Sequence, residues 1–443
     1  MKSFRILTLG CKVNQFDSEM IRDCLIRKGY EWAEFEERAD IFIINTCTVT
    51  HRADFQSRQM IRRAYRSNPD SLIIVTGCYS QVQPESLEKM KEIHYILGNR
   101  EKEFIAEFLP SFQKAELSRI QVSQIQNNCE LNLTVPATYN HTRALLKIQD
   151  GCDNRCSYCI VPYARGPSRS LPFKKLLENM KILKEKGYRE VVLTGINIGS
   201  YGRNLDSDLN LYQLLGLLEN SETPDRIRLS SIEPFNFSSN LFSLFIGSKK
   251  ICHHIHIPIQ SGDDEILQKM NRNYNRTFIS EMIQDLYHKI PDLSIGADLI
   301  VGFPGETEER FRNTYELIEK LPFSYLHIFP FSKRKGTPAE SLRTEIHPNE
   351  IKRRTEILRK LSLKKRIEFY QKFLGKELEV LGIDTKEKDI EIWKGLSKNY
   401  INVFLMDEDR IKEKSEWINR EWRVRITGMT EKGLIGKIVE GPK

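Results

Sequence analysis

Three cysteines stand close together in Gly151-Cys152-Asp153-Asn154-Arg155-Cys156-Ser157-Tyr158-Cys159, a C-x3-C-x2-C loop. Three thiolates do not complete the tetrahedral ligand set of a structural zinc, and the nearest histidine, His141, lies before the preceding apolar run. Thiolates are the usual ligands of iron–sulfur clusters. The spacing therefore predicts a cluster with one iron left open to another ligand. The alternative is a zinc loop whose fourth ligand is distant in the sequence.

The region around this loop alternates between apolar runs and helical stretches. Strands are predicted at 144–149, 191–194, 226–229, 254–257, 295–301 and 325–329, with helices between them, such as 171–186, 277–289 and 306–320. Six βα units in roughly 200 residues predict a full or partial (βα) barrel. In such a barrel the cysteine loop follows the first strand and lies at the catalytic face.

The amino-terminal part of the chain repeats a unit of apolar strand, cysteine and helix. The cysteines are Cys11, Cys47 and Cys78, and the helices are predicted at 14–28, at 52–66 and after Pro84. Such alternation predicts a parallel, doubly wound sheet, in which the loops at the carboxyl ends of the strands share one edge. The three cysteines then form a second metal-ligand set. The alternative is that each is a small buried residue that closes a strand.

The carboxyl-terminal part of the chain changes character after Gly375. Five short β-rich runs separated by charged turns predict a small all-β barrel, and they lie at 378–383, 390–393, 400–405, 422–426 and 433–439. The predicted fold class is α/β. It comprises a doubly wound parallel domain at 1–125, a (βα)6-type partial barrel at 138–368 and an all-β barrel at 371–440.

Positive charge is concentrated in one predicted helix. The whole chain has 68 Lys and Arg against 60 Asp and Glu, a net charge of +8. Between Lys352 and Arg366 there are eight basic residues and one acid, Glu356. A helix of this composition can dock on a phosphate backbone, and a solvated connector helix is the alternative. Because the β-barrel is nearly neutral, we expect the helix to supply much of any affinity for nucleic acid.

The composition excludes several classes of protein. With 40% hydrophobic and 29% charged residues, the chain is globular rather than disordered or fibrous. No apolar run approaches the roughly 20 residues that cross a bilayer, and the amino terminus has too short an apolar stretch for a secretory signal. We therefore expect a cytoplasmic protein without a membrane partner. Its nine cysteines then serve metal or redox chemistry rather than a disulfide framework.

The cysteine loop and the order of the domains resemble a known family. The pattern C-x3-C-x-aromatic-C, with Tyr158 at the aromatic place, is similar to the signature loop of radical S-adenosylmethionine (SAM) enzymes. A three-cysteine domain, a radical SAM barrel and a carboxyl-terminal TRAM barrel resemble the methylthiotransferases over the whole chain. Thr8-Leu9-Gly10-Cys11-Lys12-Val13-Asn14-Gln15 and Leu146-Lys147-Ile148-Gln149-Asp150-Gly151-Cys152 resemble the MtaB-type branch of that family.

The resemblance implies two [4Fe–4S] clusters and two SAM molecules per turnover. One cluster, with SAM at its open iron, is expected on Cys152, Cys156 and Cys159. Cleavage of this SAM gives a 5′-deoxyadenosyl radical. The second cluster is expected on the three amino-terminal cysteines, where a sulfur is methylated by the other SAM before it is inserted.

The resemblance also implies a substrate and partners. The acceptor is C2 of N6-threonylcarbamoyladenosine at position 37, next to the anticodon, so the tRNA anticodon stem-loop is the expected macromolecular partner. An electron donor of the flavodoxin or ferredoxin type is expected, and the sequence does not identify the sulfur donor. The alternative acceptors are isopentenyladenosine in tRNA and an aspartate of a ribosomal protein. The alternative to an enzyme is a non-catalytic iron–sulfur protein that binds RNA.

Six residues lie in segments that resemble the family's SAM-binding blocks. They are Gly195, Asn197, Ser231, Glu233, Gln260 and Asp298. Glu233 is expected to accept from the ribose hydroxyls or from the methionine ammonium of SAM. The alternative is that the glycines and prolines of these blocks only shape βα turns.

Two histidines, one arginine and the three remaining cysteines have expected places outside these motifs. His254 and His256 share one face of a predicted strand, and His256 is expected to line the barrel. Arg334 is expected to position a phosphate or the carboxylate of the modified base. The remaining cysteines are expected to be small buried residues, namely Cys24, Cys129 and Cys252.

Overall fold

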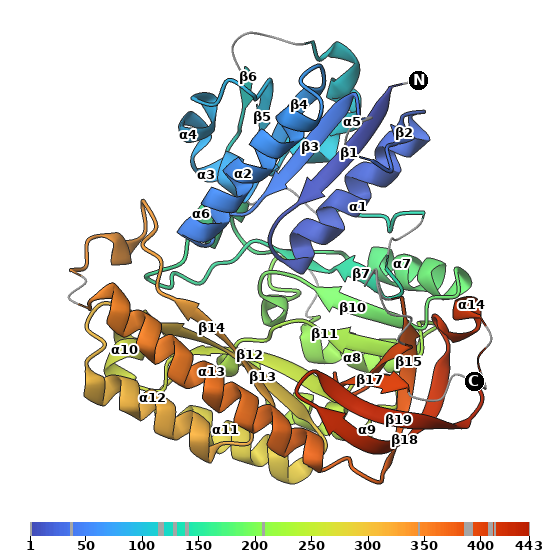
Figure 1. Ribbon diagram of the computed structural model, residues 1–443, viewed down its shortest axis with the longest axis vertical. Coiled ribbons are helices and arrows are strands. Elements are labelled where there is room, and N and C mark those ends of the chain that lie inside the picture. Colours follow the sequence, from blue (N-terminus) through green and yellow to red (C-terminus); the bar gives the residue numbers. More distant parts are fainter. Residues whose placement is uncertain are drawn as a thin grey trace.

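The computed structural model arranges the chain in three folding units (Figure 1). It describes residues 2–35, 39–113, 119–126, 131–137, 141–205, 209–343, 346–384, 393–405, 411 and 413–442. The amino-terminal sheet lies above the central barrel in Figure 1, and the carboxyl-terminal barrel lies at the lower right. No helix in these ranges is long and apolar enough to reach across a membrane.

The amino-terminal unit is a six-stranded parallel sheet in the order β2-β1-β3-β4-β5-β6. Its strands are β1 Ser3–Thr8, β2 Glu31–Trp32, β3 Ile41–Thr46, β4 Leu72–Gly77, β5 Tyr95–Leu97 and β6 Arg119–Gln121. Its helices are α1 Lys12–Arg27, α2 His51–Ser67, α3 Cys78–Val82, α4 Pro84–Glu88 and α5 Ile105–Phe108. The central strands β3 and β4 are buried at every position, as their apolar sequences require. The predicted doubly wound sheet is confirmed.

The central unit is a six-stranded partial barrel built from two parallel three-stranded sheets. The strands are β7 Ala144–Lys147, β10 Glu190–Thr194, β11 Arg226–Leu229, β12 His254–Gln260, β13 Ser294–Val301 and β14 Tyr325–Pro330. Isolated bridges from Ile227 to Ile251 and from Ser231 to His256 join the two sheets. All six strands lie where the sequence predicts them, within three residues at each end.

Helices cover the outside of this partial barrel, and their apolar faces complete one continuous core with the strands. They are α7 Phe173–Glu185, α8 Leu211–Glu219, α9 Ser239–Gly247, α10 Asp264–Lys269, α11 Arg276–Lys289 and α12 Glu308–Lys320. The short helix α6 Val161–Arg165 instead packs on α3 of the amino-terminal unit. A small antiparallel pair, β8 Gln149–Asp150 with β9 Arg169–Ser170, brackets the cysteine loop.

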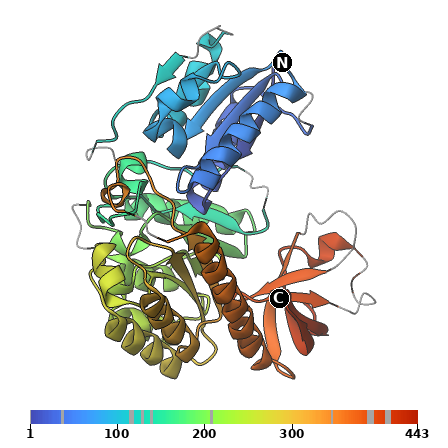
Figure 2. The ribbon, with the colours of Figure 1, turned by 60° about the vertical axis from the view of Figure 1, so that its left-hand side comes forward.

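The basic helix is α13, Pro348–Gln371, which runs between the partial barrel and the carboxyl-terminal barrel in Figure 2. Part of its charge is used inside the chain. Arg354 is buried and donates to Glu306 at 3.0 Å, Lys365 is also buried, and exposed Arg353 pairs with Glu308 at 2.8 Å. The helix is therefore a structural element as well as a carrier of charge. Its exposed basic residues are Lys352, Arg353, Arg359, Lys360 and Lys364.

The carboxyl-terminal unit is a closed five-stranded barrel in the order β15-β16-β17-β19-β18, as predicted. Its elements are β15 Glu377–Ile383, β16 Lys394–Ser397, β17 Asn402–Leu405, α14 Lys414–Trp417, β18 Glu421–Thr430 and β19 Gly433–Glu440. The second strand lies after the run predicted at 390–393: residues 390–392 are outside the described ranges, and Trp393 precedes the strand, which begins at Lys394. Trp417 and Trp422 stack at 5.5 Å in the core of this barrel.

A buried ion cluster docks this small barrel on the amino ends of the central strands. Glu190 is fully buried and accepts from Arg226 at 2.9 Å and from Arg228 at 2.8 Å. The same arginines donate to the carbonyls of Leu396, Ser397 and Lys398 at 3.0 to 3.1 Å. Burial raises the pKa of Glu190, but the two arginines outweigh burial and lower it below its ordinary value, so the carboxylate stays charged.

Replacing Glu190 by glutamine should destabilise this junction strongly. Glu190→Gln leaves the buried Arg228 without its counter-charge and leaves Arg226 with Glu421 alone at 3.1 Å, and breaking a buried pair costs about 3–5 kcal/mol in comparable sites. Denaturant titration followed by tryptophan fluorescence reports it, because three of the four tryptophans (Trp393, Trp417 and Trp422) lie in the carboxyl-terminal region. The exposed pair of Arg189 and Asp225 is the control, and Asp225→Asn should cost less than about 1 kcal/mol. Equal effects of the two substitutions would contradict the structural role of Glu190.

Candidate active site

The cysteine loop connects β8 to α6 at the carboxyl end of the first barrel strand. Its backbone is fixed by hydrogen bonds from the Cys152 amide to the Gly166 carbonyl at 3.0 Å and from the Ser157 amide to the Met270 carbonyl at 3.0 Å. Gly151 precedes the loop at φ 75°, and a Cβ there would lie 1.9 Å from the Pro167 carbonyl oxygen. Only glycine fits this close approach.

The three loop thiols are free and electrostatically coupled to one another. Burial raises the pKa of Cys159 to about 12 and that of Cys152 to about 11, and the nearby Cys156 raises both. Buried thiols of this kind are inert by themselves, because the thiolate is the reactive form. A bound metal deprotonates coordinating thiols outright. The donor set therefore fits an iron–sulfur cluster better than a nucleophilic role.

The amino-terminal cysteines also converge, at the carboxyl edge of their sheet. A Cβ on Gly10 would lie 2.9 Å from Cβ of Cys47, so the Cys11 loop packs directly on Cys47. Burial raises the pKa of Cys47 to about 12, and the charges of Cys78 and Cys11 raise it further. Cys11 is exposed, unlike a residue that merely closes a strand. The arrangement therefore favours a shared ligand set over three separate core residues.

A pocket of about 210 Å³ lies where the barrel cysteine loop meets the segment that follows Cys47. Val49 and Thr50 line it from the loop after Cys47, and Tyr158 and Cys159 line it from the barrel loop. Gln260 and Asp298 contribute polar groups to its wall. The strand ends of β13 and β14 supply its apolar side, chiefly through Ile300, Phe329 and Phe331.

The other predicted SAM-binding residues occupy two neighbouring places. Glu233 is bonded to Arg272, whose other nitrogen donates to Sγ of Cys156 at 3.1 Å. The backbone amide of Asn197 donates to Oε1 of Gln149 at 2.8 Å, and a Cβ on Gly195 would lie 2.9 Å from the same side chain.

Ser231 forms the bridge to His256 on the neighbouring strand. Of the six predicted SAM-binding residues, Gln260 and Asp298 therefore line one pocket, and Glu233 is linked to Cys156 through Arg272. The other three lie at the adjoining strand ends, namely Gly195, Asn197 and Ser231.

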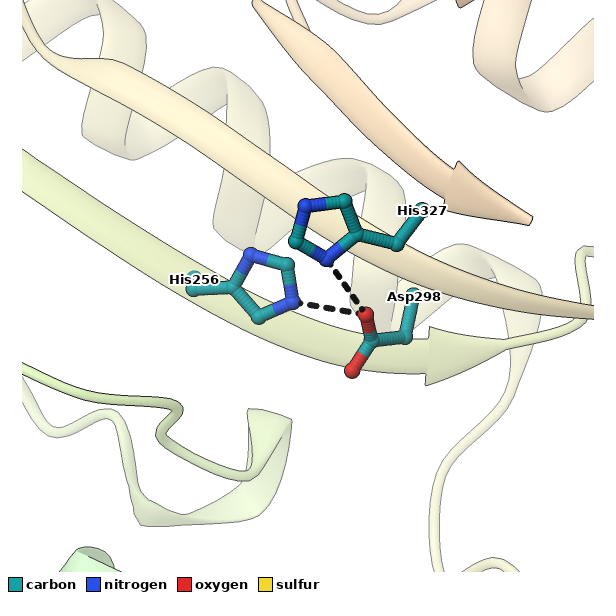
Figure 3. Close-up of side chains that lie close together, drawn as sticks. All are labelled: His256, Asp298 and His327. Carbon is teal, nitrogen blue, oxygen red and sulfur yellow. Dashed lines mark hydrogen bonds and ion pairs between the residues drawn. The ribbon is translucent and has the colours of Figure 1, made fainter. Parts of the chain in front are cut away.

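Two histidines meet at one carboxylate oxygen on the barrel wall (Figure 3). His256 donates from Nε2 to Oδ1 of Asp298 at 2.8 Å, and His327 donates from Nδ1 to the same oxygen at 3.2 Å. Burial raises the pKa of Asp298, but these hydrogen bonds lower it below its ordinary value, so the carboxylate is ionised. Within the described ranges, this is the one group whose ligand atoms all lie within 4.8 Å of one another, as a single metal ion requires.

The hydrogen-bonded chain continues away from the pocket. The hydroxyl of Tyr325 lies 3.1 Å from Nδ1 of His256 and 2.8 Å from Nε2 of His254. His254 stacks at 4.2 Å on Tyr400 of the carboxyl-terminal barrel. His254 and His256 therefore share one face, as predicted, and His256 lines the barrel. A connected set of polar groups leads from the pocket to the carboxyl-terminal unit.

Several residues of this site escaped sequence reasoning. Arg272 belongs to no motif, and its role follows only from folding, since it meets Cys156 across 116 positions of the chain. The sequence places His327 in a segment that resembles a family block near the active face, but it does not predict its bond to Asp298. Lys12 belongs to the motif around Cys11, which gives it no role of its own. Burial and the nearby Arg143 and Arg228 lower the pKa of Lys12 to about 8. Its position beside Cys11 was the one signal that pointed to it.

Comparisons with known proteins agree with this geometry. A model described as Uncharacterized protein family UPF0004 matches residues 3–98, and one for the Radical SAM superfamily matches residues 146–318. Threonylcarbamoyladenosine tRNA methylthiotransferase MtaB of Aquifex aeolicus is 40% identical to this chain, and the alignment covers 89% of this chain and 95% of the relative. The tRNA-2-methylthio-N(6)-dimethylallyladenosine synthase of Moorella thermoacetica is 33% identical over 99% of both chains.

The chain belongs to the radical SAM methylthiotransferase family. It is therefore an enzyme that uses SAM and a [4Fe–4S] cluster. TsrM of Kitasatospora setae, a radical SAM methyltransferase solved with cobalamin and a [4Fe–4S] cluster, shares the fold, with a TM-score of 0.55. It is 15% identical, and the match covers 76% of this chain and 77% of TsrM.

The structure corrects the prediction for Arg334 and completes the prediction for the three cysteines outside the two sets. Arg334 does not face a ligand in this methylthiotransferase. It is buried and donates to Oδ2 of Asp54 and to Oγ1 of Thr48, each at 2.7 Å, and so ties the barrel to the segment that follows Cys47. Cys252 is buried as predicted, Cys24 is only half-buried, and Cys129 lies outside the described ranges.

Removing the Arg334 contact should loosen the segment after Cys47 locally. Arg334→Met leaves the buried carboxylate of Asp54 with the hydroxyl of Thr48 but without its counter-charge, while the alkyl part of the side chain is retained. Hydrogen–deuterium exchange of peptides that cover residues 47–57 should become faster, because their opening free energy falls by about 3 kcal/mol or more. The neighbouring Lys335 is exposed, and Lys335→Met is the control. Unchanged exchange in Arg334→Met would show that the contact does not hold the two units together.

Proposed function

We propose that this methylthiotransferase inserts a methylthio group at C2 of N6-threonylcarbamoyladenosine at position 37 of tRNA. The observation that carries the proposal is one pocket lined both by the barrel cysteine loop and by the segment that follows Cys47, since sulfur insertion needs a C–H activating centre and a sulfur carrier close to the same atom. The name and 40% identity of the Aquifex aeolicus relative support the substrate. The second candidate acceptor is a dimethylallyladenosine in tRNA, which the 33% identical Moorella thermoacetica protein supports.

Each cysteine set fits one cluster. We assign the radical SAM cluster to Cys152, Cys156 and Cys159, whose thiols are free and grouped in one loop. A second [4Fe–4S] cluster is assigned to Cys11, Cys47 and Cys78. When bound, the clusters and SAM supply one-electron C–H activation and a methylated sulfur, the methyl group coming from a second SAM. The chain's own residues hold these groups, orient the substrate and keep water out.

The polar side chains near the loop suit the two ends of SAM. Glu233 would accept from the methionine ammonium, and Arg272 would hold its carboxylate beside Cys156, because the two side chains already meet there. Gln260 and Asp298 would accept from the ribose and adenine from the pocket wall. Gly195, Asn197 and Ser231 would support these contacts through the strand ends on which they lie.

The proposal also includes the partners and the domain limits. The tRNA anticodon stem-loop would contact the exposed basic face of α13, and a flavodoxin or ferredoxin would deliver the electrons. We place the domain boundaries at 1–125, 138–368 and 371–440, so that each unit holds one sheet system.

The two clusters can be tested separately by mutation. The anaerobically prepared enzyme is incubated with SAM, a reductant and tRNA, and mass spectrometry follows 5′-deoxyadenosine and the methylthiolated nucleoside. Wild type should form both, with about eight irons per chain, since each cubane holds four. Cys156→Ala should abolish both products, whereas Cys47→Ala should still form 5′-deoxyadenosine and lose sulfur insertion. Cys252→Ala is the control, because this buried thiol lies outside both sets.

Two results would overturn the proposal. Full methylthiolation by Cys47→Ala would refute the second cluster. Product on dimethylallyladenosine tRNA but not on threonylcarbamoyladenosine tRNA would transfer the substrate assignment to the second candidate.

Arg272 should tune the cluster assigned to the barrel loop. Its guanidinium donates to Sγ of Cys156, and a positive charge or hydrogen bond at a cluster sulfur favours the reduced state. Arg272→Gln should therefore make the reduction potential more negative by about 60–120 mV, since a hydrogen bond to a charged group contributes about 1.5–3 kcal/mol. A redox titration followed by electron paramagnetic resonance measures this. Arg276→Gln, at an exposed ion pair of 3.8 Å, is the control and should shift the potential little.

A further inference from the structure

A second pocket, of about 260 Å³, opens where all three folding units meet. Lys12 and Gln15 line it from the first turns of α1, and Arg143 lines it from the start of β7. Ile383 belongs to β15 of the carboxyl-terminal barrel. The amide of Asp384 donates to Oγ1 of Thr142 at 2.9 Å and closes the side between this barrel and β7. The pocket therefore exists only when the three units are assembled.

The ammonium of Lys12 is the unusual group in this pocket. Within the described ranges it has no hydrogen-bond or ion-pair partner, although it is partly buried. Arg143 is a second cation in the same pocket wall, and it lies 3.4 Å from the buried Glu190. Glu190 does not offer Lys12 a free oxygen, because Arg226, Arg228 and Arg143 lie at 2.9, 2.8 and 3.4 Å from its two oxygens. A cation in such surroundings is stabilised by an additional anion.

The position of Lys12 connects the pocket to the reaction. Lys12 follows Cys11 directly, and Asn14 in the same turn bonds the carbonyls of Leu9 and Thr46 at 2.7 and 3.0 Å. The turn is therefore anchored next to the amino-terminal cysteine set. The ammonium therefore stands next to the second cysteine set and lines a pocket to which β7 and β10 of the barrel also contribute, through Leu145 and Val192.

The lining favours a small amphipathic anion over a bare phosphate. The cations Lys12 and Arg143 stand beside the apolar side chains of Leu145, Val192 and Ile383. A backbone phosphate is usually met by exposed lysines and arginines on an open surface. A carboxylate on a short arm with a methyl group uses both the cations and the apolar wall. A threonyl group joined to N6 of adenine has this chemistry, and a dimethylallyl group lacks the charge.

We propose that Lys12 and Arg143 form the specificity site for the carboxylate of the threonylcarbamoyl group. The inference rests on the proposed function, since it names the part of the same nucleoside that this second pocket recognises. Lys12 supplies the charge-assisted hydrogen bond, Arg143 reinforces it, and the apolar wall covers the methyl group. An uncharged N6 substituent leaves Lys12 without an anion and is disfavoured.

The test compares one tRNA in two chemical forms, with the threonyl carboxylate free or converted to its methylamide. Wild type should prefer the free acid in kcat/KM by roughly 10- to 100-fold, the range of one hydrogen bond to a charged group. Lys12→Gln should lose about the same factor on the acid and should no longer distinguish the two forms. Arg143→Gln should change in the same direction by a smaller factor. Lys175→Gln, on the outer helix α7, is the matched control and should behave as wild type.

Independent readouts separate this proposal from the proposed function. Iron content and SAM cleavage show whether Lys12→Gln keeps its clusters, and Arg143→Gln carries the test if it does not. The Kd of the free nucleoside acid and of its methylamide, measured by calorimetry on the holoenzyme, should differ in wild type, differ less in Arg143→Gln and converge in Lys12→Gln. This measurement decides the site even if wild type methylthiolates neither tRNA, a result that would overturn the proposed function instead.

Two outcomes would overturn the specificity site. One is a wild-type enzyme with the same kcat/KM and Kd for the acid and for the methylamide. The other is an equal loss by Lys12→Gln on both tRNA forms together with a weaker salt dependence, which would assign the pocket to a backbone phosphate.

Discussion

Five buried charged side chains hold the amino-terminal sheet against the barrel, next to the segments that carry Cys11 and Cys152. Asp17 of α1 accepts from Lys102 and from Lys147 of β7, and Arg165 after the cysteine loop bonds Asp150 at 2.9 Å. Burial raises the pKa of Asp17, but the two lysines outweigh it, so the acid stays ionised. Buried ion pairs contribute little net stability, because desolvation offsets their attraction. They do fix direction and distance, and the distance between the two cysteine sets depends on this network.

Buried ion pairs also hold the folding units together at two other contacts. Arg334 binds Asp54 behind the Cys47 segment, and Glu190 with its two arginines seats the carboxyl-terminal barrel. Apolar interfaces tolerate sliding, whereas a buried charge that loses its partner costs several kcal/mol. Three polar junctions therefore define one relative placement of the three units. A site built from all of them requires this, since a displacement of about 1 Å is enough to impair catalysis.

The sequence was most informative where chemistry and periodicity coincide. The spacing of Cys152, Cys156 and Cys159 and the repeat of Cys11, Cys47 and Cys78 predict two thiol sets. The first lies in one loop between β8 and α6, and in the second the Cys11 loop packs on Cys47 at the edge of the sheet. Strands were predictable because apolar runs between turns must be buried in a parallel sheet. Pairings between distant polar residues were not predictable. Arg334 carries the charge of a ligand-binding residue, yet its partner Asp54 lies 280 positions away.

A chain of hydrogen-bonded polar side chains lines the interior of the barrel and prepares it to bind a ligand. Aliphatic side chains would pack this interior more stably, but His254, Tyr325, His256 and Asp298 occupy it and bond one another in sequence. Each member fixes the ring orientation of the next, because an imidazole that accepts at one nitrogen donates at the other. Asp298 consequently reaches the pocket as a charged acceptor of fixed orientation. Binding then requires little rearrangement of the wall, which is how preorganised polar groups discriminate between ligands.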